Sequence, residues 1–199
     1  MINELDNILE NYRKMYHDHK GLKWNKYKGD YCAGMIRDVI ARHLISNLKV
    51  VGPNVFLQDL PTEIDLLIVT ADAEPGRSTS AYPVDKARVW IEVKAHGTYG
   101  KKAKIPEEIR GSLVKSFNEA RNMNSQIECA YLTFVERCNP PKNGKSKSFW
   151  ELTLEGLDGY AKSAFCLARE PLKEIVDVSK HHRESDWNNF CRFIDSLGA

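Results

Sequence analysis

Two strongly apolar runs constrain the fold of this chain more than any other feature of its sequence. They occupy residues 64–69 and 127–135 and consist mainly of Ile, Leu, Val and aromatic side chains. A strand with one solvated face alternates apolar and polar residues, whereas a strand covered on both faces is apolar along most of its length. We therefore expect both runs to form central strands of a sheet, with other structure packed on each face.

In the rest of the chain, the spacing of apolar residues fits a helix in some segments and an extended strand in others. Apolar residues recur at helical spacing in four segments, residues 2–17, 31–47, 106–123 and 185–197. Asp30 is the expected N-cap of the second helix. Strand-like composition is found in residues 50–57, 63–70, 87–95, 127–135 and 164–168, and residues 149–159 fit a helix better than a strand. This order predicts an α/β fold with a mixed central β-sheet flanked by helices on both faces.

Length and composition indicate one folded domain. The 199 residues predict a single domain, with residues 1–29 as an N-terminal helical segment and residues 30–170 as the core. Hydrophobic residues are 42% of the chain, which is enough for a core and excludes a disordered protein. The 29 basic and 27 acidic residues nearly balance, so net charge does not by itself indicate a nucleic-acid partner.

Cysteine usage and hydropathy indicate a reducing, aqueous compartment. The five cysteines include no CxxC pair, so a zinc ribbon or a disulfide framework is not expected, and buried reduced thiols are favoured. No apolar run approaches the length of a membrane span, and no signal peptide is recognised at the N-terminus. We expect a cytoplasmic protein without a membrane segment. No P-loop or GxGxxG motif occurs, so no nucleotide cofactor is expected.

Charged residues inside two of the predicted strands identify a candidate site. Glu92 and Lys94 lie two residues apart in the run ARVWIEVKA, so they share one face of the strand while Ile91 and Val93 take the other. Asp65 interrupts the apolar run EIDLLIVT in the same way. Charges on a core strand are unfavourable unless they are paired or used. If the two strands are neighbours, Asp65, Glu92 and Lys94 converge.

The chemistry of these three side chains favours a metal-assisted hydrolytic site. Two carboxylates offer the oxygen ligands that Mg²⁺ takes in proteins, and a nearby lysine can orient or help to deprotonate water, or can neutralise developing charge. These are the components needed for phosphodiester hydrolysis. The alternative is an ordinary ion pair on a solvated edge strand, and the two interpretations differ in where the strand lies.

The order of these residues resembles the PD-(D/E)xK nuclease superfamily, which has the restriction-endonuclease-like fold. The resemblance covers residues 30–135 in the order of elements and rests on Asp65 and on the segment Glu92-Val93-Lys94. It implies that Asp65 and Glu92 bind Mg²⁺, with Mn²⁺ expected to substitute, and that Lys94 assists the attacking water.

The sequence departs from the pattern of this superfamily at two places. Pro61 lies four residues before Asp65 rather than next to it, and the predicted helix at residues 31–47 contains no glutamate, which many members carry there. Asp38, Asp30 and Glu63 are the candidate additional acids, although Asp38 is favoured as an ordinary solvated residue. The separation of 27 positions from Asp65 to Glu92 implies an inserted loop at residues 71–87.

Three basic segments are candidates for contacts with a phosphate backbone. The acid-free stretch after the strand carries Lys101, Lys102 and Lys104, and a second acid-free loop carries Lys142, Lys145 and Lys147. A third basic segment, residues 20–28, also contains aromatic residues that could stack on bases. His96 lies two residues after Lys94 in the sequence. It is a candidate to hydrogen-bond a triad residue and so to orient it. Each segment taken alone could equally be a solvated loop.

These observations predict a Mg²⁺-dependent endodeoxyribonuclease. A type II restriction endonuclease acting as a homodimer is the most natural form, because cutting both strands of a palindrome requires two sites related by a two-fold axis. A junction or repair nuclease would use the same residues. The alternative from another class is a catalytically degenerate module of the same fold that binds nucleic acid or a protein, which the missing helix glutamate favours.

Overall fold

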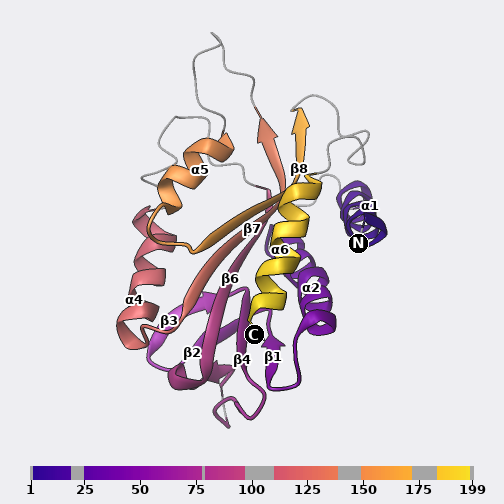
Figure 1. Cartoon of the computed structure of the whole chain (residues 1–199). Helices are drawn as coiled ribbons and strands as arrows, with labels where there is room; N and C mark the ends of the chain where they lie inside the picture. Colours follow the sequence, from indigo (N-terminus) through magenta and orange to yellow (C-terminus); the bar gives the residue numbers. More distant parts are fainter. Residues whose placement is uncertain are drawn as a thin grey trace.

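The computed structural model describes residues 2–18, 25–77, 79–96, 110–138, 149–171 and 183–197. Its centre is a five-stranded sheet with the strand order β1-β4-β6-β7-β8 (Figure 1). The strands are β1 (Leu48–Val51), β4 (Leu66–Thr70), β6 (Ala87–His96), β7 (Glu128–Cys138) and β8 (Ser163–Pro171). The β1–β4 and β4–β6 pairs are antiparallel, whereas the β6–β7 and β7–β8 pairs are parallel. The sheet is mixed, and both apolar runs form interior strands, as predicted.

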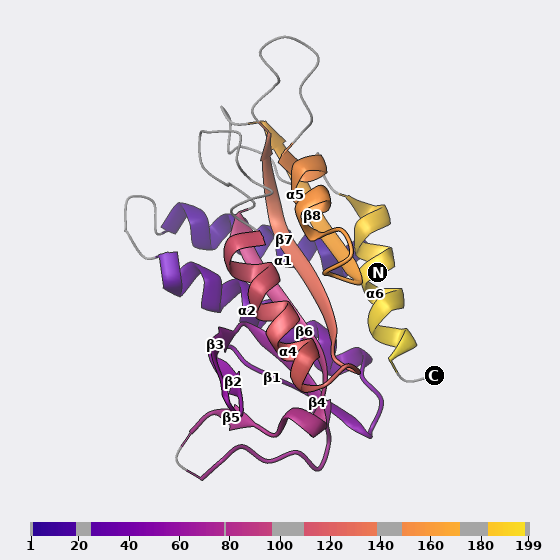
Figure 2. The same ribbon diagram turned by 90° about the vertical axis from the view of Figure 1, so that its left-hand side faces the viewer.

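Helices cover both faces of this sheet. One face packs against α1 (Ile2–Asp18), α2 (Asn25–His43) and α6 (Glu184–Ser196), and its core includes Ile36, Ile91 and Phe190. The other face packs against α4 (Lys115–Met123) and α5 (Phe149–Leu157), with Trp90 and Phe117 in its core (Figure 2). The predicted α/β class with helices on both faces is confirmed. The α5 helix also confirms the helical interpretation of residues 149–159.

A second, smaller sheet was not predicted. It has the order β3-β2-β5 and contains β2 (Val55–Leu57), β3 (Leu60–Ile64) and β5 (Ala81–Tyr82). The predicted strands at residues 50–57 and 63–70 are therefore each divided between the two sheets. The first is interrupted by the cis peptide bond Gly52–Pro53, and the second is interrupted at Asp65. The predicted loop at residues 71–87 contains β5 and a 3₁₀ turn, η1 (Val84–Lys86).

The boundaries of two helices differ from those predicted. The α2 helix begins at Asn25, so Asp30 lies inside the helix and is not its N-cap. The α4 helix is preceded by a π-helical stretch, η2 (Arg110–Val114), and the expected helix start at residue 106 lies outside the described residues. No helix in the described part of the chain is long and apolar enough to cross a lipid bilayer. Cys32, Cys129, Cys166 and Cys191 are buried free thiols, as expected.

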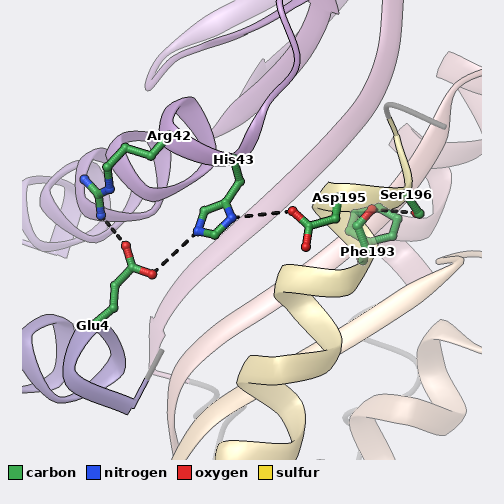
Figure 3. Close-up of polar contacts among 6 residues, drawn as sticks. All are labelled: Glu4, Arg42, His43, Phe193, Asp195 and Ser196. Carbon is green, nitrogen blue, oxygen red and sulfur yellow. Dashed lines mark hydrogen bonds and ion pairs between the residues drawn. The ribbon is translucent and has the colours of Figure 1, made fainter.

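Polar contacts connect α1, α2 and α6 at their solvent-exposed ends (Figure 3). Arg42 Nη2 of α2 lies 2.5 Å from Glu4 Oε1 of α1. His43 Nε2 lies 3.6 Å from Glu4 Oε2, and His43 Nδ1 lies 3.4 Å from Asp195 Oδ1 of α6. These four side chains form what we call the helix clasp, which brings charged groups of three helices together at the surface.

Candidate functional site

Asp65 lies at the point where the chain passes from the small sheet to the main sheet. It follows β3 and precedes β4, and Leu66 of β4 pairs with Ile91 of β6. Extending this antiparallel register by one residue places Asp65 opposite Glu92. The N–H of Val93 lies beyond the end of β4, and it donates a hydrogen bond to Asp65 Oδ2 at 2.9 Å. The side chain of Asp65 thus replaces a missing strand partner, which fixes the orientation of its carboxylate.

Glu92 and Lys94 project from the middle strand of the main sheet on one face. Alternation along β6 places Ile91 and Val93 in the core against α2 and α6, while Trp90 belongs to the core on the side of α4. Glu92 and Lys94 share the face of Trp90, as the sequence predicts. In the sheet order β6 lies between β4 and β7, so it is not an edge strand, although its pairing with β4 ends at Ile91 and Glu92 and Lys94 pair with β7 alone.

The structure brings Asp65, Glu92 and Lys94 together around one ammonium group. Lys94 Nζ contacts Glu92 Oε1 directly and lies 3.7 Å from Asp65 Oδ2. The side chains are 25%, 13% and 40% exposed for Asp65, Glu92 and Lys94. Glu92 is therefore largely shielded from water, while Lys94 reaches solvent. Two partly buried acids with one lysine between them form the convergent arrangement that the sequence predicts.

The electrostatics of Asp65 reflect its burial and its acidic neighbours. The pKa of Asp65 is raised to about 6, first by burial and then by the negative charge of Glu92, while Lys94 and the Val93 N–H act in the opposite direction. Glu63 contributes a smaller effect that also raises this pKa. A cation that approaches this site lowers the free energy of the charged carboxylates, because its positive charge compensates both acids.

Two residues behind Asp65 were not predicted to belong to the site. Cys32 of α2 is fully buried, and burial raises the pKa of its thiol, with a further increase from the charge of Asp65. Gly52 has a φ of 127°, and a Cβ there would lie 2.3 Å from the carbonyl oxygen of Asp65. Only glycine therefore allows this close approach of the two backbones. The Gly-Pro pair was visible in the sequence, but its contact partner was not.

A third unpredicted residue, Trp90, contacts Glu92 directly. Its indole Nε1–H donates a hydrogen bond to Glu92 Oε2 at 3.4 Å. The ring is fully buried and meets Phe117 of α4 edge-on, with the ring centroids 5.2 Å apart. The two-residue spacing between Trp90 and Glu92 was the available signal, because residues at this spacing share a strand face.

The candidate additional acids differ in their relation to the triad. Asp38 is exposed and pairs with Arg37 at 2.9 Å, and it lines an open cavity of about 510 Å³ between α1 and α2. Asp30 is half-buried within α2. Glu63 is exposed in β3, and its charge raises the pKa of Asp65.

The predicted nucleic-acid-binding lysines lie outside the described residues. This applies to Lys101, Lys102, Lys104, Lys142, Lys145 and Lys147. His96 is the last residue of β6, and its side chain is also outside the described part of the structure. Their predicted roles therefore stay predictions.

The donor set at Asp65 and Glu92 fits a hard divalent cation. Mg²⁺ commonly takes one or two protein carboxylates and keeps several waters. No group of three or more His, Cys, Asp or Glu side chains in the described ranges is arranged to hold a metal ion. The site therefore offers two carboxylates rather than a closed protein cage, which suits Mg²⁺ or Mn²⁺ better than a structural Zn²⁺.

Comparisons with known proteins give a distant structural likeness. No protein-family model matches the chain, and no curated protein matches its sequence. The chain resembles a solved structure of NucC from P. aeruginosa ATCC27853 in a cAAA-bound form, with a TM-score of 0.48 and 12% sequence identity. The match covers 78% of this chain and 72% of that chain. At this distance the likeness carries no functional conclusion, and the site is interpreted from its own geometry.

Proposed function

We propose that the protein is a metal-dependent endodeoxyribonuclease that hydrolyses DNA phosphodiester bonds. The observation that supports this proposal is the convergence of Asp65, Glu92 and Lys94 from two adjacent strands of the main sheet. Two acids and a lysine at this position are also what the resemblance to PD-(D/E)xK nucleases implies.

Asp65 and Glu92 would hold a divalent cation, Mg²⁺ with Mn²⁺ as a substitute. When bound, such a cation polarises a phosphoryl oxygen and makes water a stronger nucleophile at neutral pH. The chain itself provides orientation. The N–H of Val93 holds one oxygen of Asp65, and the pairing of Glu92 with Tyr131 of β7 holds the backbone that carries Glu92.

Lys94 would act on charge and on water. Its ammonium lies between the two acids and is the most exposed group of the triad, so it can reach a molecule that arrives from solvent. In that position it would orient the attacking water and stabilise negative charge on the phosphate as the charge develops. The site therefore needs the lysine for the reaction and the acids for the cation.

The substrate proposal also involves the basic loops. Lys101, Lys102 and Lys104, with Lys142, Lys145 and Lys147, would contact phosphates without reading sequence. Binding should then weaken steeply as salt rises, because each neutralised phosphate releases condensed counterions. A homodimeric type II restriction enzyme is the form we favour, and a junction or repair nuclease would use the same triad.

The deciding experiment incubates supercoiled plasmid with the protein in Mg²⁺, in Ca²⁺ and in EDTA. Of the three conditions, only Mg²⁺ is expected to support cleavage. This cleavage should be lost in the variant Lys94→Ala. The matched control is Lys86→Ala, which removes a lysine that pairs with Asp72 at 2.6 Å away from the triad. Discrete fragments would support a restriction enzyme, and nicks or branched-substrate cleavage would support a repair or junction nuclease.

The alternative function is binding without cleavage. It is favoured by the absence of a glutamate from α2, where the buried residue next to Asp65 is Cys32. A degenerate module would retain salt-sensitive DNA binding in Ca²⁺ and would leave the plasmid intact in Mg²⁺ and in Mn²⁺. That result would replace the nuclease proposal.

A further inference from the structure

The hydrogen bond from Trp90 to Glu92 has a directional consequence for the candidate site. Trp90 Nε1 donates to Oε2 of Glu92, while Oε1 of the same carboxylate contacts Lys94 Nζ. The two oxygens of Glu92 therefore have separate partners. A glutamate side chain has three rotatable bonds, so a fixed donor on one oxygen determines where the other oxygen points.

The indole N–H is itself held in place from both sides. Trp90 is fully buried on the middle strand of the sheet, and its ring packs edge-on against Phe117 of α4. A large planar ring enclosed in this way has one orientation, and its N–H points along a fixed direction. The position of Glu92 is thus determined by the core between the sheet and α4.

A second buried tryptophan shows that this hydrogen bond is not a requirement of burial. Trp187 of α6 is also fully buried, yet its Nε1 has no hydrogen-bond partner among the described residues. This protein therefore accommodates an indole in its core for packing alone. The indole N–H of Trp90, by contrast, has a hydrogen-bond partner, and that partner is Glu92, one of the two proposed cation ligands.

We propose that Trp90 is a positioning residue that holds Oε2 of Glu92 so that Oε1 faces Asp65 and Lys94, and thereby sets the cation affinity of the site. This inference rests on the proposed function. A donor behind a ligating carboxylate restricts its motion, and removal of such supporting partners typically lowers metal affinity or activity about 10- to 100-fold.

The test compares Trp90→Phe with Trp187→Phe. Each variant shortens one fully buried ring, but only Trp90→Phe removes a hydrogen-bonded donor. Ca²⁺ affinity is measured by calorimetry, and the Mg²⁺ concentration for half-maximal cleavage is measured on plasmid. We expect Trp90→Phe to lower the Ca²⁺ affinity about tenfold and to raise the Mg²⁺ concentration for half-maximal cleavage by a similar factor. The cleavage rate at saturating Mg²⁺ should change less. Trp187→Phe should leave both values near wild type.

A spectroscopic measurement on the wild-type protein requires no variant to be stable. The four tryptophans give four indole N–H signals in a ¹H–¹⁵N NMR spectrum. The Trp90 signal, assigned through its contacts with Phe117, should move when Ca²⁺ is added, because the cation withdraws charge from the carboxylate that accepts its hydrogen bond. The Trp187 signal should not move.

The outcomes separate this inference from the proposed function. A Trp90 signal that stays fixed while calorimetry shows Ca²⁺ binding overturns the positioning role. Equal metal responses in Trp90→Phe and Trp187→Phe, with active wild-type protein, overturn it as well. If the wild-type protein neither binds Ca²⁺ nor cleaves DNA, the nuclease proposal fails and the positioning role fails with it.

Discussion

The triad and the helix clasp both combine acidic and basic side chains, but in different surroundings. Each places a basic side chain between two acids from separate elements. In the clasp, Asp195 is 59% exposed and His43 sits 3.4 and 3.6 Å from its acidic neighbours. In the triad, Glu92 is 13% exposed and its neighbours are fixed by the backbone of the main sheet. Arg42 and Asp195 are each 59% exposed, so water screens these two charges of the clasp, although Glu4 at 23% is as shielded as Asp65 at 25%. Glu92 is the most shielded acid of the two groups, and its charge is compensated by its neighbours in the triad.

This difference separates charges that affect the stability and chemistry of the protein from charges that have little effect on either. Exposed ion pairs contribute little to stability, because solvent replaces the lost partner. At the triad, burial and then the charge of Glu92 raise the pKa of Asp65. Substitutions should therefore have large effects on chemistry at the triad, intermediate effects on stability near Asp65, and small effects at the clasp.

The largest expected effect is loss of activity from single changes in the triad. Lys94→Ala and Glu92→Gln should each lower the plasmid-cleavage rate by at least about 100-fold, because each removes a group that acts on the developing charge or on the cation. Ca²⁺ affinity, measured by calorimetry, should fall in Glu92→Gln. It should stay equal or rise in Lys94→Ala, which removes a competing positive charge. Wild-type cleavage by Lys94→Ala would reduce the triad to a structural ion pair.

The next effect concerns the backbone behind Asp65. Gly52→Ala should lower the free energy of unfolding by roughly 2–4 kcal/mol, since a Cβ there meets the Asp65 carbonyl and the φ is unfavourable for alanine. Chemical denaturation provides the measurement. The matched control is Gly34→Ala in α2, where a Cβ meets nothing within 4 Å. That variant should be neutral or slightly more stable. Equal stability of both variants would contradict the close approach.

The third effect is a pH-dependent gain in stability from Asp65→Asn. Because the folded-state pKa of Asp65 is raised from 3.8 to about 6, its contribution to stability is full below pH 3.8 and is lost as pH rises through 6. At pH 7 the neutral asparagine avoids this loss and can still accept the Val93 N–H bond. The variant should be about 2 kcal/mol more stable than wild type at pH 7, and the difference should vanish near pH 4.

Added cation should reverse that order. Ca²⁺ stabilises whichever protein binds it in the folded state, so the wild-type melting temperature should rise with Ca²⁺ while that of Asp65→Asn should not. Thermal melts at pH 7 with and without Ca²⁺ measure this directly. A wild-type protein that is already more stable than Asp65→Asn at pH 7 without cation would show that Asp65 carries no unfavourable charge.

The smallest effect is expected at the helix clasp. His43→Ala should change the free energy of unfolding by about 0.5 kcal/mol or less, because its contacts are long and one partner is largely exposed. Raising the salt concentration should reduce even this difference. Denaturation at low and high salt provides the measurement, and a loss comparable to that of Gly52→Ala would remove the contrast between the two regions.

The sequence predicted the class of fold and the meeting of the triad for one physical reason. Apolar runs and side-chain alternation are local signals, and they determined both the interior strands and the shared face of Glu92 and Lys94. The small sheet was missed because a bend at Asp65 leaves no mark in the periodicity of EIDLLIVT.

The environment of the triad was missed for a different reason. The close approach of Gly52 to Asp65 and the effect of the Asp65 charge on Cys32 join segments whose spatial relation depends on tertiary packing. Trp90 has the pattern of a core residue, and its pattern contains no information about where the indole N–H points. Asp38 and Asp30 were candidates by chain position alone, and helix α2 gives neither a described contact with the triad.

The pairing of Val51 with Leu67 has a consequence for variation in chain length. The chain leaves the main sheet after Val51 and re-enters it at Leu66, beside the strand it left. Residues 52–65 thus form a closed excursion whose two ends are anchored to each other. At its tip, Gln58 and Asp59 are exposed in a turn. Insertions or deletions there leave the alignment of β4 with β6 untouched, so the excursion can be resized without moving Asp65 away from Glu92.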